Sequence, residues 1–136
     1  MILKILFFIA LFFFFGCDGD IVKNIYNKDK IHKNIQNTQV VASDKLSHSF
    51  ALKSLQERGI AVQKSHYELR VELRDYKKTC TNPLSKTSSD FNYDGLVTIA
   101  LFYDGEKVYE SFKDFKGEPR KALFDELLDS MIDDLR

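Results

Sequence analysis

Residues 67–74 alternate strictly between apolar and charged side chains, and this pattern limits the possible folds more than any other feature. The apolar members are Tyr67, Leu69, Val71 and Leu73, and the charged members, of alternating sign, are Glu68, Arg70, Glu72 and Arg74. Successive side chains of a β-strand point to opposite faces, so the pattern predicts a strand with one buried and one charged face. We expect the charged face to meet solvent, with ligand binding as the alternative.

Two segments show apolar residues at helical spacing. The first, with Leu46, Phe50, Ala51 and Leu55 as its stripe, is expected to begin at an N-cap on Ser43, next to Asp44, and to end at Gly59. The second follows Glu118-Pro119 and runs to the C-terminus. Its polar side is acidic, which indicates a solvated face or a docking surface for a basic partner. These acidic residues are Asp125, Glu126, Asp129, Asp133 and Asp134.

Further strands are expected at residues 39–42, 96–103 and 107–115. Asp104-Gly105 is a strong hairpin signal between the last two. The register of the final strand stays open, because Val108 and Phe112 lie on one face while Tyr109 and Phe115 lie on the other. The order of elements predicts an α+β fold, in which two helices pack on one face of a small antiparallel or mixed β-sheet.

The N-terminus has a different composition from the rest of the chain. Lys4 is followed by eleven uncharged residues, 5–15, which are too few to span a bilayer and have no polar face for a core helix. A short basic segment before such a run is typical of a secretory signal peptide.

The uncharged run ends directly at Gly16-Cys17. This arrangement resembles the lipobox of bacterial lipoproteins, which implies cleavage between Gly16 and Cys17 and fatty acylation of Cys17. Several acyl chains together hold a protein firmly on a membrane. An ordinary signal peptide or an uncleaved anchor is the alternative. We then expect Cys80, the second of two cysteines, to be a buried thiol, with a disulfide between two chains as the alternative.

These signals divide the chain into three parts. Residues 1–16 are the expected signal peptide, residues 17–37 the lipidated cysteine and a polar, flexible tether, and residues 38–136 a single α/β domain. The tether is rich in Lys and Asn, with a short helix near residues 21–26 as an alternative. Residues 77–95 are expected to form a long loop.

The chain carries few signals for catalysis or cofactor binding. Lys plus Arg and Asp plus Glu both number 20, which argues against nucleic-acid binding. His32, His48 and His66 do not have the spacing of metal ligands. The segment 90–95 matches the first six positions of a calcium loop, with candidate ligands Asp90, Asn92 and Asp94. The twelfth position is Leu101 instead of Glu, so calcium stays an alternative, and we expect no cofactor and no enzyme activity.

In outline, residues 38–136 resemble the YajG-like and LptE-like envelope lipoproteins. In these proteins a helix, a charged alternating strand, a hairpin and a C-terminal amphipathic helix follow a lipidated cysteine, whose counterpart here would be Cys17. The resemblance implies an accessory or assembly role with an envelope protein or glycolipid, at a membrane facing the periplasm. Asp18 resembles an inner-membrane retention signal of enteric bacteria. Both the inner and the outer membrane therefore remain candidate locations, and the outer membrane is slightly favoured. The alternative is a calcium- or ligand-binding periplasmic module centred on Asp90–Asp94.

Overall fold

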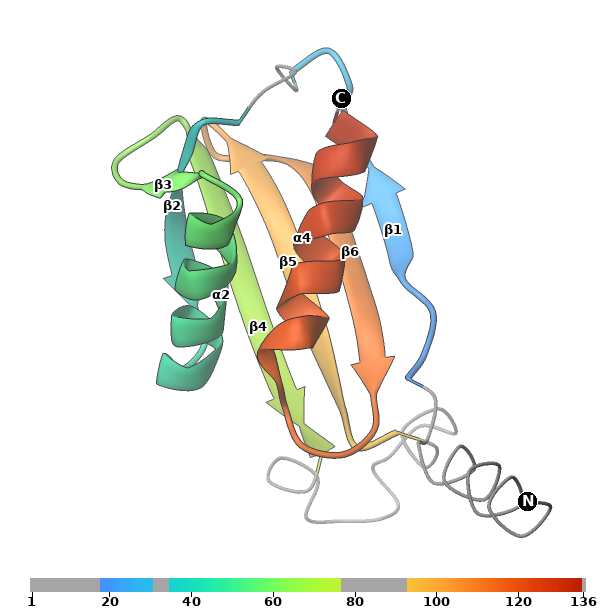
Figure 1. The fold of residues 1–136 in the computed structure, drawn as a ribbon. Coiled ribbons are helices and arrows are strands. Elements are labelled where there is room, and N and C mark those ends of the chain that lie inside the picture. The colour runs from blue at the N-terminus through green and yellow to red at the C-terminus, as the bar shows by residue number, and fades with distance from the viewer. Residues whose placement is uncertain (1–17, 31–34, 77–92, 136) are drawn as a thin grey trace, which may run out of the picture.

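The computed structural model describes residues 18–30, 35–76 and 93–135. Six strands form one mixed sheet in the order β1-β6-β5-β4-β2-β3, and two helices, α2 (Lys45–Glu57) and α4 (Lys121–Leu135), lie side by side on one of its faces (Figure 1). The predicted α+β class with both helices on one face is therefore confirmed. The strands are β1 (Val22–Ile25), β2 (Asn37–Ala42), β3 (Ala61–Val62), β4 (Tyr67–Asp75), β5 (Gly95–Tyr103) and β6 (Glu106–Phe115).

The sheet combines a parallel crossover with an antiparallel meander. Helix α2 connects β2 to its parallel neighbour β4, and β4, β5 and β6 then pair antiparallel. The alternation in β4 behaves as predicted: Tyr67, Leu69 and Val71 are buried, whereas Arg70 and Glu72 lie on the face without helices. One-sided burial of β4 thus places both helices on the same side of the sheet.

The core lies between the sheet and the two helices. Helix α4 buries its apolar stripe completely or almost completely, and Ala51 and Leu55 of α2 meet it from the side. The rings of Phe50 and Phe124 pack with their centroids 5.6 Å apart, which joins the two helices near the start of α4. The buried residues of α4 are Leu123, Phe124, Leu127, Leu128, Met131 and Leu135.

The predicted limits of the first helix are correct at its C-terminus and wrong by one residue at its N-terminus. Asp44 is the N-cap, since its side chain accepts the N–H of Ser47 at 2.8 Å, whereas the hydroxyl of Ser43 donates to Asp44. Gly59 has a φ of +71°, and the N–H of Ile60 bonds back to the carbonyl of Leu55. Gly59 therefore ends α2 in a Schellman motif, with Ile60 buried beyond it.

A β-bulge resolves the ambiguous register of the hairpin. Asp104 and Gly105 both have positive φ, as a tight hairpin turn requires. Leu101 pairs with Tyr109 but Phe102 pairs with Lys107, so Val108 is the additional residue. After the bulge, Tyr109 and Phe115 lie on the helix side of the sheet, and Phe112 lies on the other side.

The prediction of a flexible tether over residues 17–37 is wrong for part of that segment. Residues 22–25 form strand β1, not a helix, and pair antiparallel with β6, from Val22 opposite Phe112 to Ile25 opposite Tyr109. Ile21, Ile25 and Ile35 pack against the core, and β2 already begins at Asn37. The folded domain therefore begins before residue 38. Most of the predicted 77–95 loop, residues 77–92, lies outside the described residues.

Candidate functional site

The face of the sheet opposite the helices, here called the open face, combines charged, aromatic and aliphatic side chains from four neighbouring strands. Strand register places one side chain from each of three strands in a row: Val41 of β2, Arg70 of β4 and Ala100 of β5. The other members follow by alternation along each strand. They are Glu68, Glu72 and Arg74 of β4, Thr98 and Phe102 of β5, and Lys107, Glu110 and Phe112 of β6.

A shallow trough of about 360 Å³ lies on the open face. It forms because the short side chains of Ser43, Thr98 and Ala100 lie between long ones. Larger side chains from the four strands β2, β4, β5 and β6 form its walls. The charged wall residues are Arg70, Glu72, Lys107 and Glu110, and the larger apolar ones are Val41 and Phe102.

The ring of Phe102 lies close to both cations of the trough, Arg70 and Lys107. The guanidinium carbon of Arg70 lies 3.9 Å from the centre of the Phe102 ring, and the Lys107 ammonium lies 5.9 Å from it. Both separations are in the range of cation–π attraction. Arg70 also donates to Glu68, so its planar side chain is held both by a ring and by a carboxylate.

The second cation of the trough is held in a similar way. Lys107 donates to Glu110 at 3.2 Å, and the same Glu110 carboxylate accepts the hydroxyl of Tyr26 at 3.1 Å. Tyr26 follows β1, so this contact links the N-terminal segment to the open face. Each cation of the trough is thus beside a carboxylate and an aromatic ring, an arrangement that suits a ligand with both polar and apolar groups.

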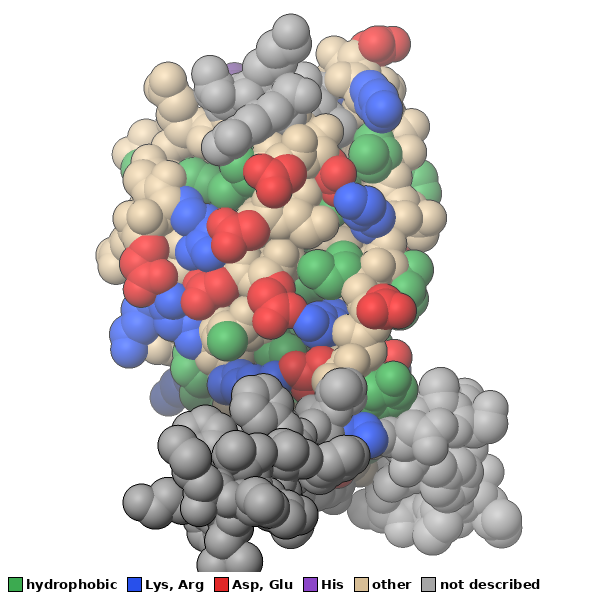
Figure 2. Space-filling view, turned by 45° about the vertical axis from the view of Figure 1, so that its right-hand side comes forward, with side chains coloured by type: hydrophobic (Ala, Val, Ile, Leu, Met, Phe, Trp, Pro, Cys, Tyr) green, Lys and Arg blue, Asp and Glu red, His purple; other side chains and the backbone are tan. Residues whose placement is uncertain are grey.

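Several carboxylates on the acidic side of α4 form ion pairs with other residues of the same chain. Arg58, the C-cap residue of α2, donates to Asp129 at 2.7 Å and to Asp125 at 3.2 Å. Lys121 donates to Asp125 at 2.8 Å. Glu126 pairs with Lys113 of β6. Figure 2 accordingly shows acidic and basic side chains intermixed over the side that carries α4.

These contacts change the ionisation of Asp125. Partial burial opposes the charged form, but hydrogen bonds from Lys121 and from the hydroxyl of Ser54 outweigh burial and hold the pKa of Asp125 below its ordinary value. Ser54 is fully buried and donates to Asp125 at 2.6 Å. The carboxylates of α4 thus join the helices to each other and to the sheet.

Of the three candidate calcium ligands, only Asp94 lies among the described residues. Asp90 and Asn92 lie outside the described residues, whereas Asp94 uses one carboxylate oxygen to accept the N–H of Gly117 at 2.6 Å. Gly95, the sixth position of the loop pattern, has a packing role of its own, because an added Cβ would lie 2.4 Å from the ring of Phe115. Within ranges 18–30, 35–76 and 93–135, no three His, Cys, Asp or Glu residues are grouped to hold a metal ion.

The lipidation candidates Gly16 and Cys17 also lie outside the described residues, as do Cys80 and His32. The next residue, Asp18, is described and contacts the connection between β6 and α4. It accepts the N–H of Lys116 at 3.0 Å and pairs with the guanidinium of Arg120. Sequence reasoning missed this contact, because nothing in the pattern of residues 18–37 marks a partner near residue 120.

The two described histidines lie apart from the trough. His48 is exposed on α2, and His66 contacts Asp104 at 2.6 Å near the hairpin turn. The side chains of His66 and Asp104 are both more than half exposed. They form a surface pair that links the residue before β4 to the hairpin turn between β5 and β6.

Comparison with known proteins gives no relative. No family model, no curated protein and no solved structure matches the chain. In the part of the chain that the structure describes, no helix has the length and apolar character needed to cross a bilayer.

Proposed function

We propose that the protein is a lipid-anchored lipoprotein of the bacterial cell envelope. In this proposal, it binds another envelope component through its open face and catalyses no reaction. The uncharged run that ends at Gly16-Cys17 supports the anchor. Acylation of Cys17 would hold the domain on a membrane, facing the periplasm. We favour the outer membrane over the inner one.

The open face is the observation that carries the binding role. Both helices cover the opposite face, and no described element covers this one (Figure 1). The alternative surfaces are less suited to a partner. Asp125, Glu126 and Asp129 of α4 already pair within the chain, and the outermost strands β1 and β3 have four and two residues. Short outer strands offer little backbone for an added strand.

The chemistry of the trough favours a protein partner over a phosphate-bearing glycolipid. A polyanionic headgroup requires a surplus of cations, but Arg70 is paired with Glu68, and Lys107 is paired with Glu110. The trough instead offers a half-buried aromatic ring with an arginine stacked on it. Arg and aromatic residues contribute most of the binding energy at protein–protein interfaces. We therefore assign the trough to a polypeptide segment of an envelope protein.

Membrane fractionation tests the anchor. In cells that process lipoproteins, the wild-type chain and a Cys80→Ala variant should stay with the membrane after high-salt washing, and Cys17→Ala should not. Cys80→Ala is a matched control, because it removes the other thiol of the chain. Retention of Cys17→Ala on washed membranes would contradict the proposal.

Photo-crosslinking in intact cells tests the binding face. A crosslinking amino acid at Val41, which is 50% exposed at the trough, should capture one defined envelope protein. The same amino acid at Ala122, exposed on α4, should not capture it. Adding Phe102→Ala should abolish the Val41 adduct, because the ring that positions Arg70 is gone. Equal capture from Val41 and Ala122, or capture that survives Phe102→Ala, would contradict the assignment.

A further inference from the structure

The residue that follows the proposed lipidation site is part of the folded domain. Asp18 accepts the N–H of Lys116 and pairs with Arg120, so both its carboxylate oxygens are engaged. The N–H of Gly19 donates to the carbonyl of Asp114 at 3.0 Å. A Cβ on Gly19 would lie 3.2 Å from the Cβ of Asp114, so the backbone approaches β6 closely here. Residues 18 and 19 are therefore held against the end of β6.

This contact leaves almost no length for a tether. Consecutive Cα atoms lie about 3.8 Å apart, so the Cα of Cys17 can lie no farther than that from the Cα of Asp18. A lipid on Cys17 would thus start within one residue of the folded surface. The distance of the domain from the bilayer is then set by the contacts of Asp18, not by a chain of twenty flexible residues.

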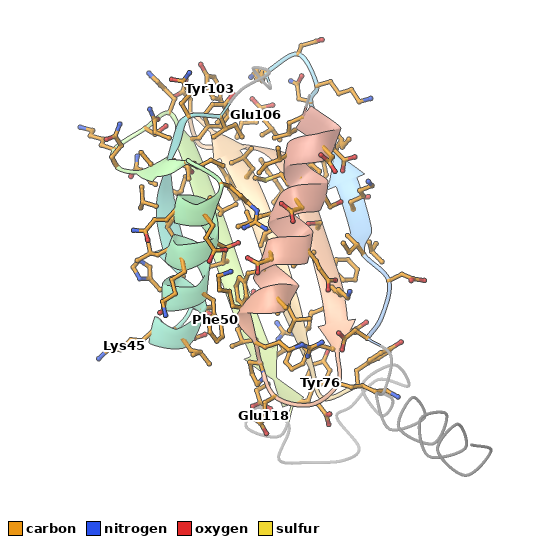
Figure 3. All side chains as sticks on the ribbon, viewed as in Figure 1. Lys45, Phe50, Tyr76, Tyr103, Glu106 and Glu118 are labelled. Carbon is orange, nitrogen blue, oxygen red and sulfur yellow. The ribbon has the colours of Figure 1, made fainter. Side chains whose placement is uncertain are left out.

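Asp18 lies at one particular end of the sheet, here called the anchor end. The anchor end comprises Tyr76 at the end of β4, Asp94 before β5, and the connection 116–120 after β6. Backbone bonds join these parts: Tyr76 donates to Asp94 at 2.9 Å, and Asp94 donates to Phe115 at 2.8 Å. Figure 3 shows Tyr76 and Glu118 at this end and Tyr103 and Glu106 at the opposite end.

We propose that the anchor end faces the lipid bilayer and that the Asp104-Gly105 turn points away from it. This orientation rests on the proposed acylation of Cys17. Strand β4 has nine residues, and a strand rises about 3.3 Å per residue, so the two ends of the sheet are about 30 Å apart. In this orientation the long axes of the strands are roughly perpendicular to the membrane. The open face then lies perpendicular to the bilayer surface, where partners in the periplasm can reach it.

Quenching by lipid headgroups tests the orientation. Mature protein purified from membranes in a Cys80→Ser background carries a fluorophore either at Glu118→Cys on the anchor end or at Lys64→Cys. Lys64 is exposed and precedes β4, whose first residue Tyr67 pairs with Tyr103 at the opposite end. Both proteins are reconstituted into phosphatidylethanolamine–phosphatidylglycerol vesicles that contain a headgroup nitroxide. We expect several-fold stronger quenching at residue 118 than at residue 64 in the vesicle-bound fraction.

The outcomes separate the orientation from the anchor. Equal quenching at the two positions in protein that floats with the vesicles, or stronger quenching at residue 64, would overturn the orientation alone. Protein that does not float with the vesicles would overturn the anchor and the orientation together.

A pair of aspartate variants tests the contact that sets the orientation. Asp18→Ala removes the contacts with Lys116 and Arg120, whereas Asp20→Ala changes an exposed residue two positions later. We expect the difference in quenching between residues 118 and 64 to decrease in Asp18→Ala and to stay at the wild-type value in Asp20→Ala. An undiminished difference in Asp18→Ala would overturn the role of Asp18.

Discussion

Tyr109 shows, at the scale of single residues, how one buried hydroxyl connects three elements. Its side chain is fully buried on β6, and its hydroxyl donates to Asp134 of α4 at 3.0 Å. The same carboxylate accepts Lys23 of β1 at 2.9 Å. Burial, supported by the neighbouring Asp134 carboxylate, raises the pKa of Tyr109 to about 12.

This raised pKa predicts a loss of stability at alkaline pH. Between about pH 10 and 12 the unfolded chain loses the Tyr109 proton while the folded chain keeps it, so the free energy of unfolding falls as the pH rises. Tyr109→Phe should be less stable by about 1 kcal/mol at neutral pH and should lose less stability over the alkaline range. Urea unfolding at several pH values measures both effects. Parallel pH profiles for the two proteins would contradict the assignment.

Gly95 provides a second prediction at the residue scale. A methyl group there would meet the Arg74 carbonyl and the Phe115 ring, both 2.4 Å away. Gly95→Ala should therefore destabilise the fold by about 1–3 kcal/mol, as overpacking does. Adding Phe115→Leu to Gly95→Ala should cost less than Phe115→Leu costs alone, which a double-mutant cycle by urea unfolding measures. Additive effects would show that the ring does not limit this position.

At the scale of elements, the N-terminus of α2 depends on Asp44. Partial burial opposes ionisation of Asp44, but hydrogen bonds from the Ser47 N–H and the Ser43 hydroxyl outweigh it and hold the pKa of Asp44 below its ordinary value. Near pH 4 the unfolded chain therefore binds more protons at this residue than the folded chain does. The stabilisation is present above that pH and is lost as the pH falls through the folded-state pKa.

Three variants check this cap by thermal or urea unfolding. Asp44→Ala should destabilise by about 1 kcal/mol at neutral pH, and Asp44→Asn by much less, because Asn also caps helices well. Asp44→Asn should also flatten the decline of stability between about pH 5 and 3. Lys45→Ala, an exposed neighbour, serves as the control and should change stability little. Equal effects of Asp44→Ala and Lys45→Ala would contradict the cap.

The elements that could be predicted from sequence are those with local signals. Strand β4 has its period of two, α2 and α4 have apolar stripes at helical spacing, and the hairpin has Asp104-Gly105. Strand β1 could not be predicted, because its four residues pair with a strand more than 80 residues away and are largely exposed. Residues 22–25 become a strand because they pair with the edge of β6, and no residue near them in the sequence signals this pairing.

The candidate site was predictable only in part, for the same reason. The charged face of β4 follows from alternation alone. The trough requires Val41, Thr98 and Lys107 to meet Arg70, and strand pairing brings these residues together. The contact of Arg70 with Phe102 is diagonal across β4 and β5, so it depends on register, which a single strand does not specify.

At the scale of the whole molecule, residues 18–26 distinguish a domain held at its anchor from a domain on a flexible tether. Their amides should exchange slowly, because β1 pairs with β6 and the N–H of Tyr26 donates to Val108 at 2.9 Å. Hydrogen exchange followed by mass spectrometry should show protection in peptides that cover β1. Complete exchange within seconds would indicate a tether and would remove the basis of the proposed orientation.

The intact mass of the protein extracted from membranes is the decisive test of the lipid anchor at Cys17. We predict a chain that begins at Cys17 and carries the added mass of a diacylglyceryl group and an amide-linked acyl chain. Cys17→Ala should lack the added mass, and Cys80→Ala should keep it. A chain cleaved at another residue without added mass would contradict the lipid anchor, and the protein would then be an exported domain without a lipid.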